Sequence, residues 1–70
     1  MDWRKVITVE PGKRSGQACI RGYRITVADI LSYLGAGMTI EAVLVDFPQL
    51  TRDDIHAALL YASERGRAAW

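Results

Sequence analysis

Few side chains in this sequence could take part in acid–base chemistry, and two of them lie close together. His56 is the only histidine, and Asp53 precedes it by three residues. At that spacing the two side chains share one face of a helix, so the carboxylate can reach the imidazole. A histidine with a carboxylate is only part of a general-base arrangement, and the sequence shows no nucleophile paired with it. We therefore predict no catalytic residue and no enzymatic activity.

The sequence also lacks the residue patterns that a metal site or a phosphate-binding loop needs. One cysteine, Cys19, and one histidine cannot complete a tetrahedral zinc site within a chain, so we expect no metal and no cofactor. Residues 11–16 form a polar loop with glycine and basic side chains, but a phosphate-binding loop needs Gly-Lys-Ser/Thr entering a helix. Here a predicted strand follows instead. Lys13 and Arg14 remain candidates for contact with an anion.

Charge is distributed unevenly along the chain. Residues 1–24 carry six basic and two acidic side chains, whereas residues 25–70 carry three basic and six acidic ones. A basic arm on an acidic body suits an anionic partner. The alternative is that these charges belong to solvated loop ends, and the sequence leaves both interpretations open.

The first third of the chain predicts a short β-hairpin arm over residues 1–25. Apolar, β-branched runs at residues 6–9 and 18–20 flank the polar loop, and residues 23–26 are expected to continue the extended chain. A two-stranded hairpin is marginal in water. The strands must therefore pair with another copy or lie on the helices.

Three threonines predict the starts of three helices. Thr26, Thr39 and Thr51 each precede apolar residues at helical spacing. Asp29 and Asp54 stand three residues after the first and third threonine, as in a capping box.

Glycine and proline predict where these helices end. Gly35 and Gly37 follow the first helix, Pro48 stops the second and Gly66 marks the end of the third. The resulting helices of roughly 8, 9 and 14 residues would be marginal alone and must pack on each other. We predict one mainly α domain whose trihelical core, residues 26–66, is homeodomain-like or winged-helix-like. Its second and third helices have helix-turn-helix dimensions.

A helix-turn-helix protein reads DNA with the first turn of its second helix. In this chain that turn belongs to the third predicted helix and offers Thr51, Arg52 and His56, of which Arg52 could contact guanine. Asp53 and Asp54 would repel phosphates there. The basic arm would therefore have to supply much of the affinity.

The size of the chain predicts self-association. Half of its 70 residues are hydrophobic, more than so small a core can bury, so we expect a homodimer. Trp3, Leu60 and Tyr61 are the interface candidates; the alternative is that they cover the chain's own core. No apolar run reaches the ~20 residues of a membrane span. A lone cysteine without a signal-like N-terminus favours the cytoplasm.

The order of several short motifs resembles one bacterial family. Residues 19–27 read CIRGYRITV, which is similar to the stretch IRGTRIPV of the family called domain of unknown function 433. The resemblance continues through GMTIEAVL at residues 37–44, DFPQLT at 46–51 and DIHAAL at 54–59, and covers about residues 6–62. The chain departs from the pattern at Tyr23, at Thr26 and at residues 17–18.

This resemblance implies a trihelical fold with an N-terminal β arm, usually dimeric, and an antitoxin role. Such an antitoxin would bind a PIN-like toxin encoded beside it and repress its own operon. By position, Arg21, Gly22 and Arg24 match the family signature and join Lys13 and Arg14 as candidates for DNA or partner binding. The alternative is that Arg21 and Arg24 pair with acids of the same dimer and hold the arm. A stand-alone DNA-binding regulator and a structural interaction domain remain the competing functions, and no small-molecule substrate is expected.

Overall fold

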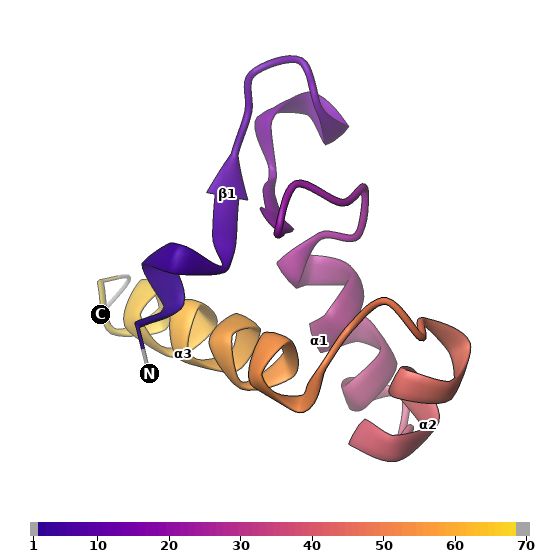
Figure 1. The fold of residues 1–70 in the computed structure, drawn as a ribbon. Helices are drawn as coiled ribbons and strands as arrows, with labels where there is room; N and C mark the ends of the chain where they lie inside the picture. Colours follow the sequence, from indigo (N-terminus) through magenta and orange to yellow (C-terminus); the bar gives the residue numbers. More distant parts are fainter. Residues whose placement is uncertain (1, 69–70) are drawn as a thin grey trace.

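A two-stranded antiparallel hairpin precedes three helices in the computed structural model, which describes residues 2–68 (Figure 1). The strands are β1 (Ile7–Val9) and β2 (Ala18–Ile20), with one-turn segments η1 (Trp3–Lys5) before them and η2 (Arg14–Gly16) between them. The helices are α1 (Val27–Gly35), α2 (Ile40–Asp46) and α3 (Arg52–Ala68). The mainly helical, trihelical fold with a β arm is therefore confirmed.

The hairpin lies on the helices of its own chain. Its register pairs Ile7 with Ile20 and Val9 with Ala18. Because side chains alternate along a strand, these four residues share one face of the hairpin. Ile7 and Ile20 are buried in the same core as residues of α1, α2 and α3. Packing on the chain's own helices thus stabilises a hairpin that would be marginal alone.

A tight reversal follows β2. The N–H of Tyr23 donates to the carbonyl of Ile20 over 2.7 Å. Between them Arg21 has φ +48° and Gly22 has φ +77°. Positive φ at both central residues defines a type I′ turn, in which glycine at the second position avoids steric cost.

The chain therefore turns where we expected it to stay extended. After the turn, the N–H of Ile20 donates to the carbonyl of Ile25 over 3.0 Å, and Cys19 forms an isolated bridge with Thr26. The predicted extended run at residues 23–26 is thus realised only at its end, where it lies against β2. This short return leads the chain directly into α1.

The three predicted threonine caps are all present. Thr26 and Asp29 form a capping box, in which the N–H of Asp29 donates to Thr26 Oγ1 over 2.9 Å. Thr39 caps α2 by accepting from Ala42 N at 3.1 Å. Thr51 and Asp54 form a second capping box through bonds of 3.0 and 3.2 Å. These caps supply partners for N–H groups that have none inside a helix.

The helices have 9, 7 and 17 residues, so the third is longer than predicted. Gly37 has φ +100° just beyond α1, and α2 ends before Pro48, as expected. The prediction that Gly66 ends the third helix was wrong, because α3 continues to Ala68. Glycine inside a helix costs about 1 kcal/mol relative to alanine, and good helix formers on both sides of it can offset that cost.

Strand β2 and each of the three helices contribute one fully buried, β-branched apolar side chain to the core. These are Ile20 from β2, Ile30 from α1, Val43 from α2 and Ile55 from α3. Ala57 and Ala58 are also fully buried on α3, and their small side chains let neighbouring elements approach that helix closely. Figure 1 shows η1 beside α3 and the hairpin rising above the helices. The arm and the start of α3 are therefore held in one packed unit.

Candidate functional site

The turn after β2 is tied to the first turn of α3. Arg21 Nε lies 2.6 Å from Asp54 Oδ1, and the Asp54 side chain is completely buried. The other carboxylate oxygen of Asp54 accepts the N–H of Thr51. Both oxygens are thus occupied within the chain. A buried carboxylate needs such partners, since an unpaired one would be costly.

Arg14 makes the equivalent contact at the start of α1. Its Nη1 donates to the carbonyl of Arg24 at 2.6 Å and to Asp29 Oδ2 at 3.1 Å. Burial alone would raise the pKa of Asp29. Hydrogen bonds from Thr26 and the nearby Arg14 guanidinium outweigh it and hold the pKa of Asp29 below its ordinary value.

The backbone that presents Arg14 is left-handed. Arg14, Ser15 and Gly16 have φ values of +50°, +59° and +78°. For residues other than glycine this conformation costs roughly 1–2 kcal/mol each. Contacts of Arg14 with Arg24 and Asp29 help to hold the turn in this conformation.

Lys13 also holds the arm together, through contacts with the turn after β2 and with the residue that follows β1. Its Nζ donates to the carbonyl of Gly22 and lies 2.8 Å from Glu10 Oε2. Four of the five predicted arm residues, Lys13, Arg14, Arg21 and Gly22, are thus engaged within the chain. The exposed Arg24 makes no side-chain hydrogen bond or ion pair with residues 2–68. For Arg21, the structure corresponds to the alternative in which it pairs with an acid of the protein, here within one chain, whereas Arg24 has no such pair with the described residues.

Side chains of the predicted DNA-reading turn also have partners within the chain. Arg52 forms an ion pair with Glu41 of α2, and the Arg52 hydrogen bond lowers the pKa of Glu41. Thr51 is exposed, and its hydroxyl serves as the helix cap. His56 is also exposed and lines a shallow depression of about 440 Å³ with Asp53, Leu59 and Leu60. The structure therefore brings acids, rather than free cations, to this turn.

Two of the three predicted interface residues pack against each other. The rings of Trp3 and Tyr61 meet edge to face with centroids 5.1 Å apart. Trp3 Nε1 donates to Glu64 Oε2 over 2.7 Å, which holds η1 on α3. Both aromatic residues are half-buried against the chain's own core, whereas Leu60 is 43% exposed.

Leu31 of α1 and Leu59 of α3 continue the apolar spacing of their helices, yet neither is buried. Leu31 is 38% exposed and Leu59 is 37% exposed. The end of the hairpin lies near the beginning of α1, and α2 lies nearer the beginning of α3 than its end (Figure 1). An apolar periodicity shows which face is apolar, but not how far a neighbouring element covers it.

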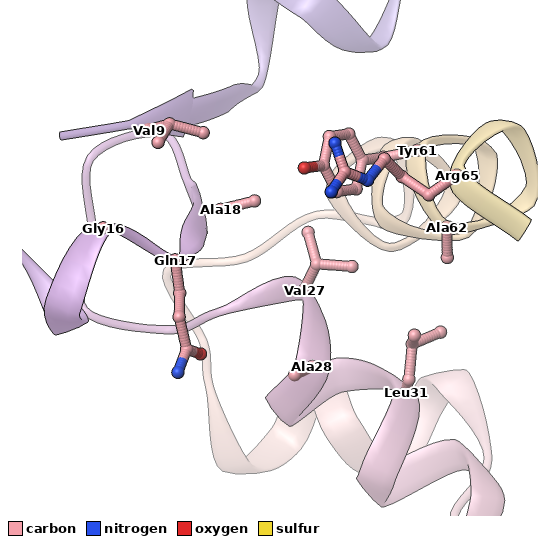
Figure 2. A pocket seen from close by; sticks show the side chains of 10 residues that line it. All are labelled: Val9, Gly16, Gln17, Ala18, Val27, Ala28, Leu31, Tyr61, Ala62 and Arg65. Atoms are coloured by element: carbon pink, nitrogen blue, oxygen red, sulfur yellow. The ribbon is translucent and has the colours of Figure 1, made fainter. Parts of the chain in front are cut away.

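The uncovered part of α1 borders an apolar groove that the sequence analysis missed. The groove has a volume of about 660 Å³ and lies between the end of the hairpin, α1 and the second half of α3 (Figure 2). Its lining residues are Val9, Gly16, Gln17, Ala18, Val27, Ala28, Leu31, Tyr61, Ala62 and Arg65. These residues come from the hairpin with its loop, from α1 and from α3, which are distant in sequence, so no single periodic pattern marks the groove.

The groove has a basic residue at its rim. The guanidinium carbon of Arg65 lies 5.7 Å from the centre of the Tyr61 ring. Figure 2 shows both side chains on α3, across the groove from Val9 and Ala18 of the hairpin. This arrangement combines apolar walls with one exposed positive charge.

The remaining chemistry of the described residues is limited. No group of three His, Cys, Asp or Glu side chains within residues 2–68 is placed to hold a metal ion. Cys19 is buried, and its thiol donates to the carbonyl of Gln17 over 3.3 Å. No helix in this part of the chain is long and apolar enough to span a bilayer.

Comparisons with known proteins agree with the fold. Residues 7–62 match the model of a family described as "Protein of unknown function (DUF433)". A crystal structure of a DUF433 member from Anabaena variabilis ATCC 29413 is similar with a TM-score of 0.86 and 32% identity, over 93% of this chain and 64% of that one. An uncharacterized protein of Sinorhizobium fredii is 33% identical over 67 residues, which are 91% of this chain and 30% of the relative. This chain thus spans less than two thirds of the length of either protein.

Proposed function

The chain belongs to the DUF433 family, and on that premise we propose that it is a non-enzymatic, antitoxin-like protein that binds and neutralises a PIN-like toxin. One observation carries the protein-binding part of this proposal: the basic arm residues are mostly engaged internally, while an apolar groove stays open. An open apolar groove on so small a domain is typical of a surface that recognises another protein. The identity of the toxin class rests on the family resemblance.

The proposed mechanism is occlusion. The antitoxin would cover the active site of the toxin with a rigid surface rather than modify it chemically. The capped helices and the Arg21–Asp54 pair support a rigid binding surface. Preorganisation of this kind lowers the entropic cost of association.

Coexpression with the product of the neighbouring reading frame tests this function. We expect the two proteins to copurify in a stable complex and the antitoxin to relieve growth arrest by the toxin. A toxin that remains lethal, with no complex on size-exclusion chromatography, would contradict the proposal.

Autoregulation of the operon is a separate part of the proposal. Binding to upstream DNA would have to use Arg24 and other exposed cations, because Arg52 is paired with Glu41. Fluorescence anisotropy at two salt concentrations measures the affinity for upstream DNA, with scrambled DNA as the comparison. Affinity that falls with salt and drops in Arg24→Ala but not in Arg52→Ala would support arm-mediated repression. Equal affinity for upstream and scrambled DNA would remove the regulatory role.

A homodimer is the proposed oligomeric state, with Leu60 and Leu59 of α3 at its interface. Both leucines are exposed beside His56 and Asp53. Sedimentation equilibrium of Leu60→Asp, with Val45→Asp on α2 as the control, tests this assignment. A monomer only for Leu60→Asp would support it, and an unchanged dimer would contradict it. The cytoplasm is the proposed compartment, in keeping with the free thiol of Cys19.

A further inference from the structure

We propose that the groove between the hairpin, α1 and α3 receives an apolar segment of a partner protein that carries a carboxylate for Arg65. This inference deepens the proposed function, because it states which surface binds the partner and which chemistry the partner must offer. It rests on that function, and its test distinguishes a failure of the groove assignment from a failure of the proposed function.

The walls of the groove fit apolar side chains. Val9, which is 59% exposed, lies on the hairpin side, and Leu31 lies on α1 (Figure 2). Ala18, Ala28 and Ala62 contribute small side chains between them. Small residues leave room for the side chains of an incoming segment, and covering the exposed Val9 and Leu31 removes apolar surface from water.

The positive charge of Arg65 determines which polar group the partner segment must carry. Its guanidinium stacks near the Tyr61 ring and is exposed, and it forms no ion pair with residues 2–68. By contrast, Arg14, Arg21 and Arg52 each have a carboxylate partner within the chain. A planar guanidinium at the edge of an apolar groove matches a carboxylate bidentately.

A nucleic-acid backbone fits this surface less well. Phosphate recognition uses several cations in a row, because each neutralised phosphate adds to the affinity. The basic residues of the neighbouring arm, Lys13 and Arg14, are held by Glu10 and Asp29. Arg65 is the one cation among the described residues that line the groove, which favours a protein segment with a single acidic residue.

Two variants of the full chain test the groove without removing core contacts. Ala28→Phe fills it from an exposed position of α1, and Arg65→Glu reverses its charge at an exposed position of α3. Val45→Asp is the matched control, because Val45 is 77% exposed on α2 and does not line the groove. Circular dichroism and thermal unfolding check that each variant is folded.

The readout is the affinity for the product of the neighbouring reading frame, measured by calorimetry. We expect each groove variant to weaken binding by about tenfold or more, and the control to leave it unchanged. An acidic-to-lysine substitution in the partner should recover part of the affinity with Arg65→Glu. Recovery of this kind is specific to a direct charge pair.

Three outcomes would overturn the inference. Unchanged affinity of both folded groove variants would place the partner elsewhere and leave the proposed function standing. Loss of self-association in these variants, with toxin binding intact, would make the groove a contact between copies of this chain. Absence of binding by the unaltered protein would contradict the proposed function and the inference together.

Discussion

Asp54 at the first turn of α3 accepts a hydrogen bond from Arg21, whose Nε lies 2.6 Å away across 33 residues of sequence. The same carboxylate closes the capping box with Thr51. One buried side chain thus both starts the longest helix and holds the turn of the arm against it. Arg14 and Asp29 repeat this arrangement at the start of α1.

Removal of the Arg21 side chain should destabilise the fold. In Arg21→Ala the buried Asp54 carboxylate loses its charged partner, and we expect a loss of about 1–3 kcal/mol in the free energy of unfolding. Urea denaturation measures it. Arg52→Ala is the control, since its pair with Glu41 is exposed on both sides, is screened by solvent and should contribute much less. Equal losses in the two variants would contradict the role of burial.

Gly22→Ala should also lower stability, through the backbone. Gly22 has φ +77° at the second central position of the type I′ turn, and a side chain there costs about 1 kcal/mol. An added Cβ would come no nearer than 3.9 Å to Lys13 Nζ, so the cost is conformational and not steric. Gly12→Ala is the control, because nothing lies within 4 Å of an added Cβ there. Equal melting temperatures for the two variants would show that the turn tolerates a side chain.

Acid should weaken the fold partly through Asp29. Its pKa is lowered in the folded state, so its contribution to stability is fully present above the ordinary aspartate pKa of about 3.9 and is lost as the pH falls through the folded value. Asp29→Asn should therefore show a smaller drop in unfolding free energy than the unaltered protein when the pH is lowered from about 5 to about 2. Urea titrations at several pH values test this. Parallel pH profiles would exclude a contribution from this carboxyl.

Ser15→Gly should stabilise the protein. Ser15 adopts φ +59° and ψ +34°, a left-handed conformation that glycine reaches without strain. We expect a gain of up to about 1 kcal/mol after the greater unfolded-state entropy of glycine is subtracted. Ser15→Ala keeps the left-handed strain and serves as the control. A lower melting temperature for the glycine variant would show that the turn stores no strain at this residue.

The local features of this protein follow from residues that are close together in the chain. Thr26, Thr39 and Thr51 cap helices whose first turns lie within three residues of them. Pro48 stops α2 by acting on the residue before it. Such hydrogen bonds and steric restrictions involve near neighbours in the chain, and their residue types can therefore be read directly.

The pairing of the charges and the exposure of the apolar surface depend instead on contacts between elements distant in the sequence. The basic arm was a candidate for binding an anionic partner, yet Arg21 reaches Asp54 and Arg14 reaches Asp29 only after the hairpin packs on the helices. The groove likewise exists only because β2, α1 and α3 meet with small residues between them. Local sequence sets the hydrogen bonds of each turn, whereas the partner of a charge and the exposure of an apolar face depend on which elements pack together.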